Sequence, residues 1–275
     1  MNPLHAAILG ALQGLTEILP ISSSAHLILV PRLFAWPESG LTFDVALHVG
    51  TMLALCIYFW RDILELTDSF FRYLGNREAA SQADRLPLHI IVATVPAAVA
   101  GKTLEGPIEE LFRHSPAIIA LLLIGFGLIL AIAEYRGARR YDLGRITMGA
   151  AIAIGLAQCL ALIPGVSRSG ITITAALLLG FRRDAATRFS FLLSLPIVAG
   201  AGLLKLGHLA RHGIPAGETG PLLIGIATSA LFGYLSIAFL LRYVQSRTFS
   251  PFVWYRLLAG AGVLVWLYLA GGGPA

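Results

Sequence analysis

Apolar runs of membrane-spanning length constrain this chain more than any other feature of its sequence. A hydrocarbon core of about 30 Å is crossed by about 20 helical residues. Six runs approach that length, and they cover residues 43–60, 86–102, 116–134, 188–205, 221–241 and 252–270. With 57% hydrophobic and 13% charged residues among 275, the chain is more apolar than a soluble domain tolerates. The sequence therefore predicts an all-α polytopic membrane protein that forms a single integral-membrane domain over residues 1–275.

Two further apolar regions are interrupted by residues that break helices. The first covers residues 4–36 and contains Pro20 and several serines, and the second covers residues 146–182 and contains the stretch PGVSRSG. The halves are too short to span comfortably, so we expect each region to form two helices joined by a tight tip and returning to the same face. Such re-entrant hairpins are tolerated at membrane depth only where protein or a water-filled cavity satisfies the freed backbone groups.

The order of these segments predicts an inverted repeat. A re-entrant hairpin followed by three transmembrane helices occurs twice, in units that cover approximately residues 1–140 and 141–275. Gln13 aligns with Gln158, and after one residue is dropped Ser23 aligns with Ser167. Because three spans separate the hairpins, the second unit has the opposite orientation. Inverted repeats with broken helices place polar sites near the membrane midplane, where the units meet.

The arginines are concentrated on one side of this predicted topology. By the positive-inside rule that side is cytoplasmic, which leaves both termini and the mouth of the first hairpin outside. We therefore expect the site to open toward the outer face. This distribution also explains the net charge of +5 without a nucleic-acid partner. The richer side holds Arg61, Arg72, Arg77, Arg85, Arg136, Arg139, Arg140, Arg145, Arg182, Arg183, Arg188, Arg242, Arg247 and Arg256, and the other side holds Arg32, Lys102, Arg113, Lys205 and Arg211.

The first hairpin carries an amide and a carboxylate within its apolar first half. Gln13 and Glu17 are four residues apart, so in a helix they point from the same face. Their oxygens suit a hard divalent cation such as Mg²⁺ or Ca²⁺, which would keep several waters and bridge to phosphate oxygens. Glu17 is a candidate metal ligand, general base or counter-ion of a buried arginine, and Gln13 a candidate metal ligand or an interhelical contact.

Hydroxyl groups and an imidazole follow the break in the first hairpin. Ser22, Ser23 and Ser24 are N-cap candidates for the second half-helix, whose first backbone N–H groups present a positive dipole end. His26 is three residues after Ser23 and shares its face. A hydroxyl and a base on one face are suited to phosphoryl transfer, in which Ser23 or His26 attacks, or His26 acts as an acid or base.

The second hairpin carries a matching set of anion-binding groups. Ser167, Arg168, Ser169 and Gly170 open its second half-helix, and Thr172 lies on the same face as Arg168. Two facing helix N-termini with hydroxyls and a guanidinium between them form a pocket of the kind that phosphate occupies. A guanidinium inside the membrane is costly unless it is paired or hydrated. Either an ion pair with the glutamate of the first hairpin or a bound phosphate is needed to compensate for it.

Other polar and aromatic residues have simpler interpretations. Asp44 and His48, four residues apart near the start of a span, are expected to form an interfacial pair rather than a catalytic one. Aromatic residues near span ends are expected to anchor the protein at the membrane interface, and they are Trp36, Trp60, Trp254 and Tyr255.

Both broken regions resemble the motifs of one family. QGLTEILPISSSAHL resembles the Glu/Gln-x-x-x-Glu plus serine and histidine motif, and PGVSRSGITIT the PGxSRSG motif, of the undecaprenyl-diphosphate phosphatase (UppP or BacA, bacitracin resistance protein) family. The similarity covers most of the chain. It implies an enzyme of the bacterial plasma membrane that hydrolyses undecaprenyl diphosphate to undecaprenyl phosphate and inorganic phosphate. The product carries peptidoglycan and other cell-envelope precursors, and extra enzyme confers resistance to bacitracin.

The resemblance also implies roles for individual residues. Glu17 stands at the acidic position of the family motif, and Gln13 stands where the family takes either Glu or Gln, so a divalent cation is expected between them. The serine and histidine considered as nucleophile or acid/base are matched by Ser23 and His26. The diphosphate-binding element is matched by Arg168 with Ser167, Ser169 and Thr172.

Other functions and several details stay open at this point. A secondary transporter or lipid flippase also builds its midplane site from inverted repeats and broken helices. An intramembrane serine protease is weaker, because it gives Arg168 no role. The sequence leaves open whether serine, histidine or water attacks, which cation is used and whether the chain forms a homodimer.

Overall fold

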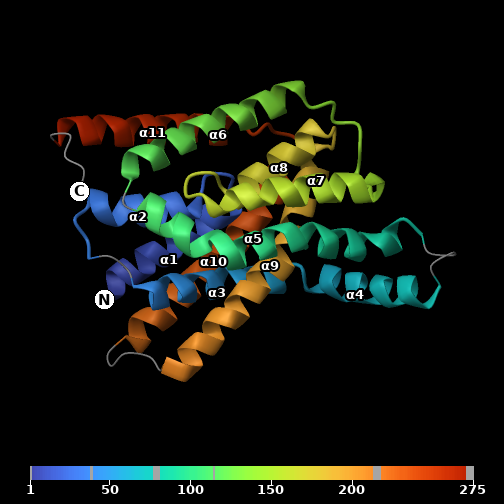
Figure 1. The fold of residues 1–275 in the computed structure, drawn as a ribbon, viewed down its shortest axis with the longest axis horizontal. Coiled ribbons are helices and arrows are strands. Elements are labelled where there is room, and N and C mark those ends of the chain that lie inside the picture. The colour runs from blue at the N-terminus through green and yellow to red at the C-terminus, as the bar shows by residue number, and fades with distance from the viewer. Residues whose placement is uncertain (1, 38–39, 77–80, 114, 213–217, 271–275) are drawn as a thin grey trace.

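A computed structural model describes a helical bundle (Figure 1). Apart from an isolated bridge between Tyr141 and Phe181, the regular elements of the described chain are helices. Of the charges assigned to the two sides, Arg77 lies outside the described residues, as do the side chains of Arg113, Lys205 and Arg211. The described residues are 2–37, 40–76, 81–113, 115–212 and 218–270.

Four helices of the described chain are long and apolar enough to cross a membrane. They confirm the predicted spans at 86–102, 116–134, 221–241 and 252–270. The predicted span at 188–205 lies within one long helix, α9 (Arg183–His212). The four candidates are Ala83–Leu104 at the start of α5 (Leu86–Arg113), α6 (Pro116–Arg136), α10 (Thr219–Tyr243) and α11 (Ser250–Leu269).

A fifth candidate span is bent. The predicted run at 43–60 forms α3 (Leu41–Tyr58), which is followed by α4 (Trp60–Gly75) at an angle of 72°. None of the predicted spans or hairpins covers α4, which carries several charged residues. They are partly paired, because Nε of Arg72 donates to Oδ1 of Asp84 at 2.9 Å.

Two pairs of short helices correspond to the interrupted apolar regions. The first pair is α1 (Pro3–Ile18) and α2 (Ser23–Leu33). The second pair is α7 (Met148–Gln158), extended by a 3-10 turn (Cys159–Leu162), and α8 (Arg168–Leu178). Residues 19–22 form the first break and residues 163–167 the second. Figure 1 shows the two pairs approaching each other near the middle of the bundle.

Each break ends in a serine with a left-handed backbone. Ser22 has φ 75° and precedes α2, and Ser167 has φ 73° and precedes α8. A non-glycine residue rarely adopts this conformation, because its Cβ crowds the backbone. Ser22 and Ser167 are 145 positions apart, as are Gln13 and Gln158. By backbone conformation Ser167 therefore resembles Ser22, one residue before the Ser23 with which the sequence aligned it.

Close glycine contacts fix the first helix of each pair against the other half of the chain. A Cβ added to Gly10 of α1 would lie 2.6 Å from the carbonyl oxygen of Gly225 in α10. A Cβ added to Gly155 of α7 would lie 2.3 Å from the carbonyl oxygen of Ala93 in α5. Gly10 and Gly155 are again 145 positions apart. Both breaks are thus held by helix packing that only glycine allows.

Candidate active site

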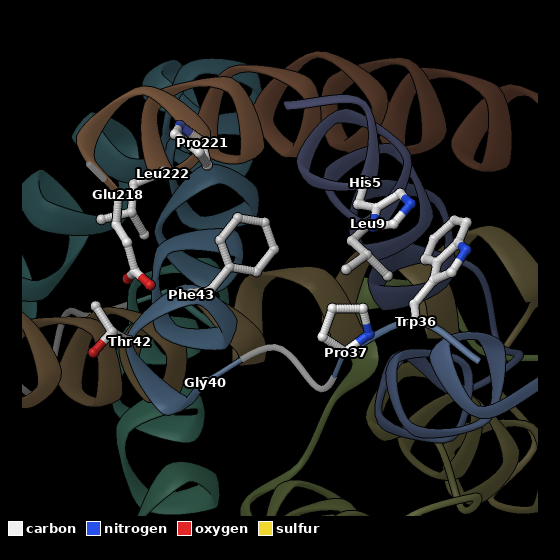
Figure 2. A pocket seen from close by; sticks show the side chains of 10 residues that line it. All are labelled: His5, Leu9, Trp36, Pro37, Gly40, Thr42, Phe43, Glu218, Pro221 and Leu222. Atoms are coloured by element: carbon white, nitrogen blue, oxygen red, sulfur yellow. The ribbon is translucent and has the colours of Figure 1, made fainter. Parts of the chain in front are cut away.

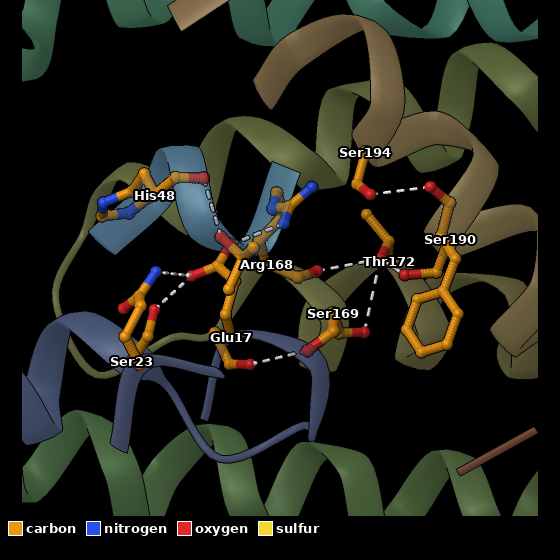
Figure 3. Close-up of polar contacts among 12 residues, drawn as sticks. Glu17, Ser23, His48, Arg168, Ser169, Thr172, Ser190 and Ser194 are labelled. Carbon is orange, nitrogen blue, oxygen red and sulfur yellow. Dashed lines mark hydrogen bonds and ion pairs between the residues drawn. The ribbon is translucent and has the colours of Figure 1, made fainter. Parts of the chain in front are cut away.

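The two breaks contact each other through side chains that the sequence singled out. Nη2 of Arg168 lies 2.5 Å from Oε1 of Glu17, so α8 and α1 are joined by an ion pair (Figure 3). The hydroxyl of Ser169 donates to the carbonyl of Leu19 at 3.1 Å. The ion pair that the sequence allowed as compensation for a buried arginine is therefore present.

Glu17 is the centre of a small polar cluster. The Ser23 hydroxyl donates to Oε2 of Glu17, and Nε2 of Gln13 approaches the same oxygen at 3.4 Å. The Glu17 side chain is 9% exposed and that of Arg168 is 16% exposed, while Gln13 is fully buried. One carboxylate thus holds an arginine, a hydroxyl and an amide in a largely dehydrated place, where electrostatic interactions are strong.

Two polar atoms of this cluster are buried and have no hydrogen-bond partner among the described residues. They are Nη1 of Arg168 and Oε1 of Gln13. Buried polar atoms are nearly always paired, so an unpaired one calls for an explanation. Nη1 offers N–H groups suited to an anion, and Oε1 offers an oxygen suited to a hard cation or a water.

The ring of His26 is bonded away from Ser23 and Glu17. Its Nδ1 lies 2.6 Å from the carbonyl oxygen of Ser22 and its Nε2 lies 2.6 Å from the hydroxyl of Tyr255. Because a carbonyl only accepts, Nδ1 carries the proton. The imidazole also stacks on Tyr255. The predicted pairing of Ser23 with His26 is thus replaced by Ser23 with Glu17, and Tyr255 contacts a site residue instead of serving only as an interfacial anchor.

The hydroxyls of α8 are mostly used within the protein. Ser167 caps α8 by accepting from the N–H of Gly170 at 3.1 Å. Thr172 is 1% exposed, donates to the carbonyl of Arg168 at 2.8 Å and lies 2.6 Å from the Ser190 hydroxyl (Figure 3). These contacts favour a supporting role for Thr172 and Gly170 in place of the predicted contact with substrate.

His48 faces the polar cluster. Its Nδ1 lies 2.8 Å from the backbone carbonyl of Asp44, and the residue is close enough to Glu17 for their charges to interact (Figure 3). The predicted pair of Asp44 and His48 stays a prediction, and the proximity of His48 to Glu17 is an addition to it.

Arg256 is a buried charged residue for which the sequence predicted no contact with the site. It was predicted among the cytoplasmic arginines, but it is 0% exposed and lies within α11, which runs beside α6 (Figure 1). Its guanidinium donates to the carbonyls of Pro20 and Val166, both at 3.1 Å, and of Gly165 at 2.7 Å. The available signal was an arginine inside an apolar run, which indicates function by default.

A cavity at the opposite end of α1 contains none of the predicted site residues. Its volume is about 340 Å³, and Trp36 on its wall stacks on His5 with ring centroids 4.1 Å apart (Figure 2). Phe43 and Leu222 make the wall largely apolar, and Glu218 contributes a carboxylate. The polar cluster around Glu17, and not this cavity, combines a carboxylate, a hydroxyl and a guanidinium.

Fold and site together define a class of protein. It is an integral-membrane protein in which two broken helix pairs bring a carboxylate, a hydroxyl and an arginine with a free N–H face into one buried place. The chain matches the family model described as bacitracin resistance protein BacA over residues 6–262, and it belongs to that family.

Similar proteins match along almost their full length. An undecaprenyl-diphosphatase from Geobacter sulfurreducens is 68% identical over 98% of this chain and 99% of its own. One from Geobacter metallireducens is 65% identical with the same coverage, and one from Geotalea daltonii is 61% identical over 97% of this chain and 99% of its own. The family that the motifs resembled is confirmed.

Proposed function

We infer that this chain is an undecaprenyl-diphosphatase of the bacterial inner membrane. It hydrolyses undecaprenyl diphosphate to undecaprenyl phosphate and inorganic phosphate, which supplies the lipid carrier for cell-envelope polymers and implies bacitracin resistance. The names and identities of its relatives support this activity, as does the family. The structural observation that carries it is the contact of Arg168 with Glu17, with Nη1 of the arginine left for an anion.

The diphosphate binds where the N-termini of α2 and α8 meet. Nη1 of Arg168 and the first N–H groups of the two helices neutralise the charge on the phosphoryl oxygens, as phosphoryl transfer demands. Ser22, Ser167 and Ser169 border this place and complete the binding element. The undecaprenyl chain remains in lipid, since its transfer into water would expose a large apolar surface.

Glu17 manages the proton of the attacking group. The Ser23 hydroxyl already donates to Glu17, so the carboxylate can take its proton as Ser23 attacks phosphorus and the bond to the leaving phosphate oxygen breaks. Water then releases the phosphoryl group from Ser23. Two alternatives are direct attack on phosphorus by water, with Glu17 as the base, and direct attack on phosphorus by His26. The arrangement favours Glu17 over His26 as the base for Ser23.

A divalent cation, Mg²⁺ or Ca²⁺, fits one edge of the cluster. The unpartnered Oε1 of Gln13 and the carboxylate of Glu17 are the oxygen donors that a hard cation prefers. With a single carboxylate, such a cation depends on phosphate oxygens and waters for its other ligands. When bound it would neutralise charge on the diphosphate. The described residues contain no group of three or more His, Cys, Asp or Glu able to hold a metal by themselves.

The two halves of the chain form an inverted repeat of re-entrant hairpins with three spans each. The left-handed serines 145 positions apart and the matching contacts of Gly10 and Gly155 support this arrangement. The arginine distribution supports a cytoplasmic mouth for the second hairpin, both termini outside, and a site that opens toward the outer face. Repeat units near 1–140 and 141–275 within a single domain follow from it, and a homodimer stays a prediction.

Phosphate release from undecaprenyl diphosphate by the purified chain in detergent tests the proposal. We expect hydrolysis by the wild type, loss on chelation with recovery on adding Mg²⁺ or Ca²⁺, and loss in Arg168→Ala and Glu17→Ala. Arg136→Ala, an exposed arginine at the end of α6, is the matched control. Retained hydrolysis in Arg168→Ala would contradict the proposed site, and chelator-resistant hydrolysis would contradict the cation.

Liposome flux separates the enzyme from its rival. A secondary transporter or flippase would move lipid diphosphate across the bilayer without releasing phosphate. We expect phosphate release without any need for an ion gradient. Gradient-driven movement with no phosphate release would replace the proposed function.

A further inference from the structure

Arg256 is the largest side chain that is fully buried in the described chain, and its hydrogen-bond partners in the structure are backbone carbonyls. A charged group at membrane depth needs compensation. Here the compensation comes from four carbonyl dipoles, including that of Leu123 in α6 at 3.2 Å from Nε. The guanidinium uses its planar fork to reach groups in several directions at once.

Three of these carbonyls belong to the two breaks. Pro20 is in the first break, and Gly165 and Val166 are in the second. Nη1 alone joins the two, because it donates to Pro20 and to Val166 at 3.1 Å each. Backbone carbonyls freed from a helix inside a membrane need such a donor. Arg256 thus satisfies both breaks and ties them to α11.

The breaks are also the most strained part of the site. Ser22 and Ser167 have φ values of 75° and 73°, and non-glycine residues in sparsely populated conformations persist only where their surroundings hold them. Gly170 leaves room for the guanidinium of Arg256, since a Cβ at residue 170 would lie 3.1 Å from Nη1 of Arg256. The guanidinium of Arg256 therefore occupies a space that exists because residue 170, in the PGVSRSG stretch, is a glycine.

We propose that Arg256 is a positioning residue for hydrolysis. It fixes the first break relative to the second, so that Glu17 and Ser23 on one side meet the phosphate bound by Arg168 on the other at a set separation. It does this through the backbone of the breaks and not by touching the substrate. The proposal rests on the proposed function for its kinetic part only, because the rigidity of the breaks can be measured without hydrolysis.

Arg256→Lys keeps the charge and removes the fork, and it is the deciding variant. We expect kcat to fall about 100-fold, as misplacement of reacting groups by about 1 Å does, with KM changed by less than about threefold. Arg168→Lys, a change at a contact residue, should raise KM as well. Arg242→Lys, an exposed arginine of α10, is the matched control and should leave both constants unchanged.

Hydrogen exchange supplies the second measurement. In Arg256→Lys, amides of residues 19–23 and 163–169 should exchange faster than in the wild type, while those of the middle of α10 should not. If this variant fails to fold, Gly170→Ala replaces it, because the added Cβ would lie 3.1 Å from Nη1 of Arg256 and from Cβ of Ser167, so that the guanidinium has to shift without being removed. Its kcat should fall with KM unchanged, and the same amides should exchange faster.

The outcomes separate this proposal from the proposed function. Wild-type kcat in Arg256→Lys, or a loss of kcat with unchanged exchange in the breaks, would overturn the positioning role. Faster exchange in the breaks combined with no phosphate release by the wild type would uphold the role of Arg256 as a brace and overturn the proposed function instead.

Discussion

The two helix pairs have the same backbone break but carry different chemistry. Each break ends in a left-handed serine, and the equivalent positions are 145 residues apart. At that spacing Glu17 corresponds to Leu162, and Ser23 to Arg168. The first pair thus holds the acid and hydroxyl, and the second holds the cation. The two breaks therefore share a backbone conformation but present different side chains to the place where they meet.

Exchanging the charges between the pairs should have the largest effect. In Glu17→Arg combined with Arg168→Glu the ion pair is retained, but the base no longer lies beside Ser23 and the cation no longer lies on α8. We expect phosphate release to fall by about 1000-fold or more, the scale of lost electrostatic stabilisation at an active site. Substantial activity in the double variant would mean that the two pairs are interchangeable and would break the comparison.

Substitution of Ser23 at the start of α2 should affect catalysis, whereas substitution of Ser167 before α8 should mainly affect stability. Ser23→Ala removes the hydroxyl bonded to Glu17, and kcat should fall by about 100-fold if Ser23 only positions water and by far more if Ser23 is the nucleophile. Ser167→Ala removes an N-cap and should cost about 1 kcal/mol of stability with a small effect on kcat. Steady-state kinetics and thermal unfolding in detergent check both. Equal kinetic losses would indicate that Ser167 also takes part in the chemistry.

Removing the Tyr255 hydroxyl that bonds His26 should lower kcat less than Ser23→Ala does. Tyr255→Phe keeps the stacked ring but removes the hydroxyl that lies 2.6 Å from Nε2 of His26. A neutral hydrogen bond contributes about 1 kcal/mol, so kcat should fall by about fivefold if His26 has to be oriented. Tyr268→Phe, at an exposed tyrosine of α11, is the control. An unchanged kcat in Tyr255→Phe would mean that hydrolysis does not require the hydrogen bond between Tyr255 and His26.

The smallest effect on catalysis is expected from the packing glycines. Gly10→Ala and Gly155→Ala should each destabilise the fold by about 1–3 kcal/mol, the usual cost of overpacking, since each Cβ would approach a carbonyl closely. Gly262→Ala in α11, where a Cβ meets nothing within 4 Å, should not destabilise it. Thermal unfolding measures all three. A loss of stability in only one of the Gly10→Ala and Gly155→Ala variants would weaken the evidence that the two halves are repeats.

The parts of the fold that depend on local sequence were predicted well. Runs of apolar residues become helices in a membrane because the backbone has to satisfy its own hydrogen bonds, and Pro20 and Pro164 interrupt them for an equally local reason. The pairing of Glu17 with Arg168 was also within reach, because a buried arginine demands compensation. None of the predicted spans or hairpins covers the amphipathic helix α4.

The contacts that the sequence did not predict are those made with other helices. Arg256 and Tyr255 were interpreted from their position near the start of an apolar run, and His48 from its spacing from Asp44 alone. In each case the rotation of the helix and the depth of its neighbour decide whether the side chain faces lipid, water or the site. That information is absent from the spacing of residues along one segment.

The sequence by itself determined the membrane setting, the two breaks and the chemical groups available at them. Hydropathy, proline and a costly buried charge act through nearest neighbours and through the solvent, so they can be read along the chain. Only the tertiary structure decided that Ser23 bonds Glu17, that His26 bonds Tyr255 and that Arg256 joins the breaks. Those partners are set by packing between helices that are far apart in the chain, where distances below 4 Å depend on every intervening contact.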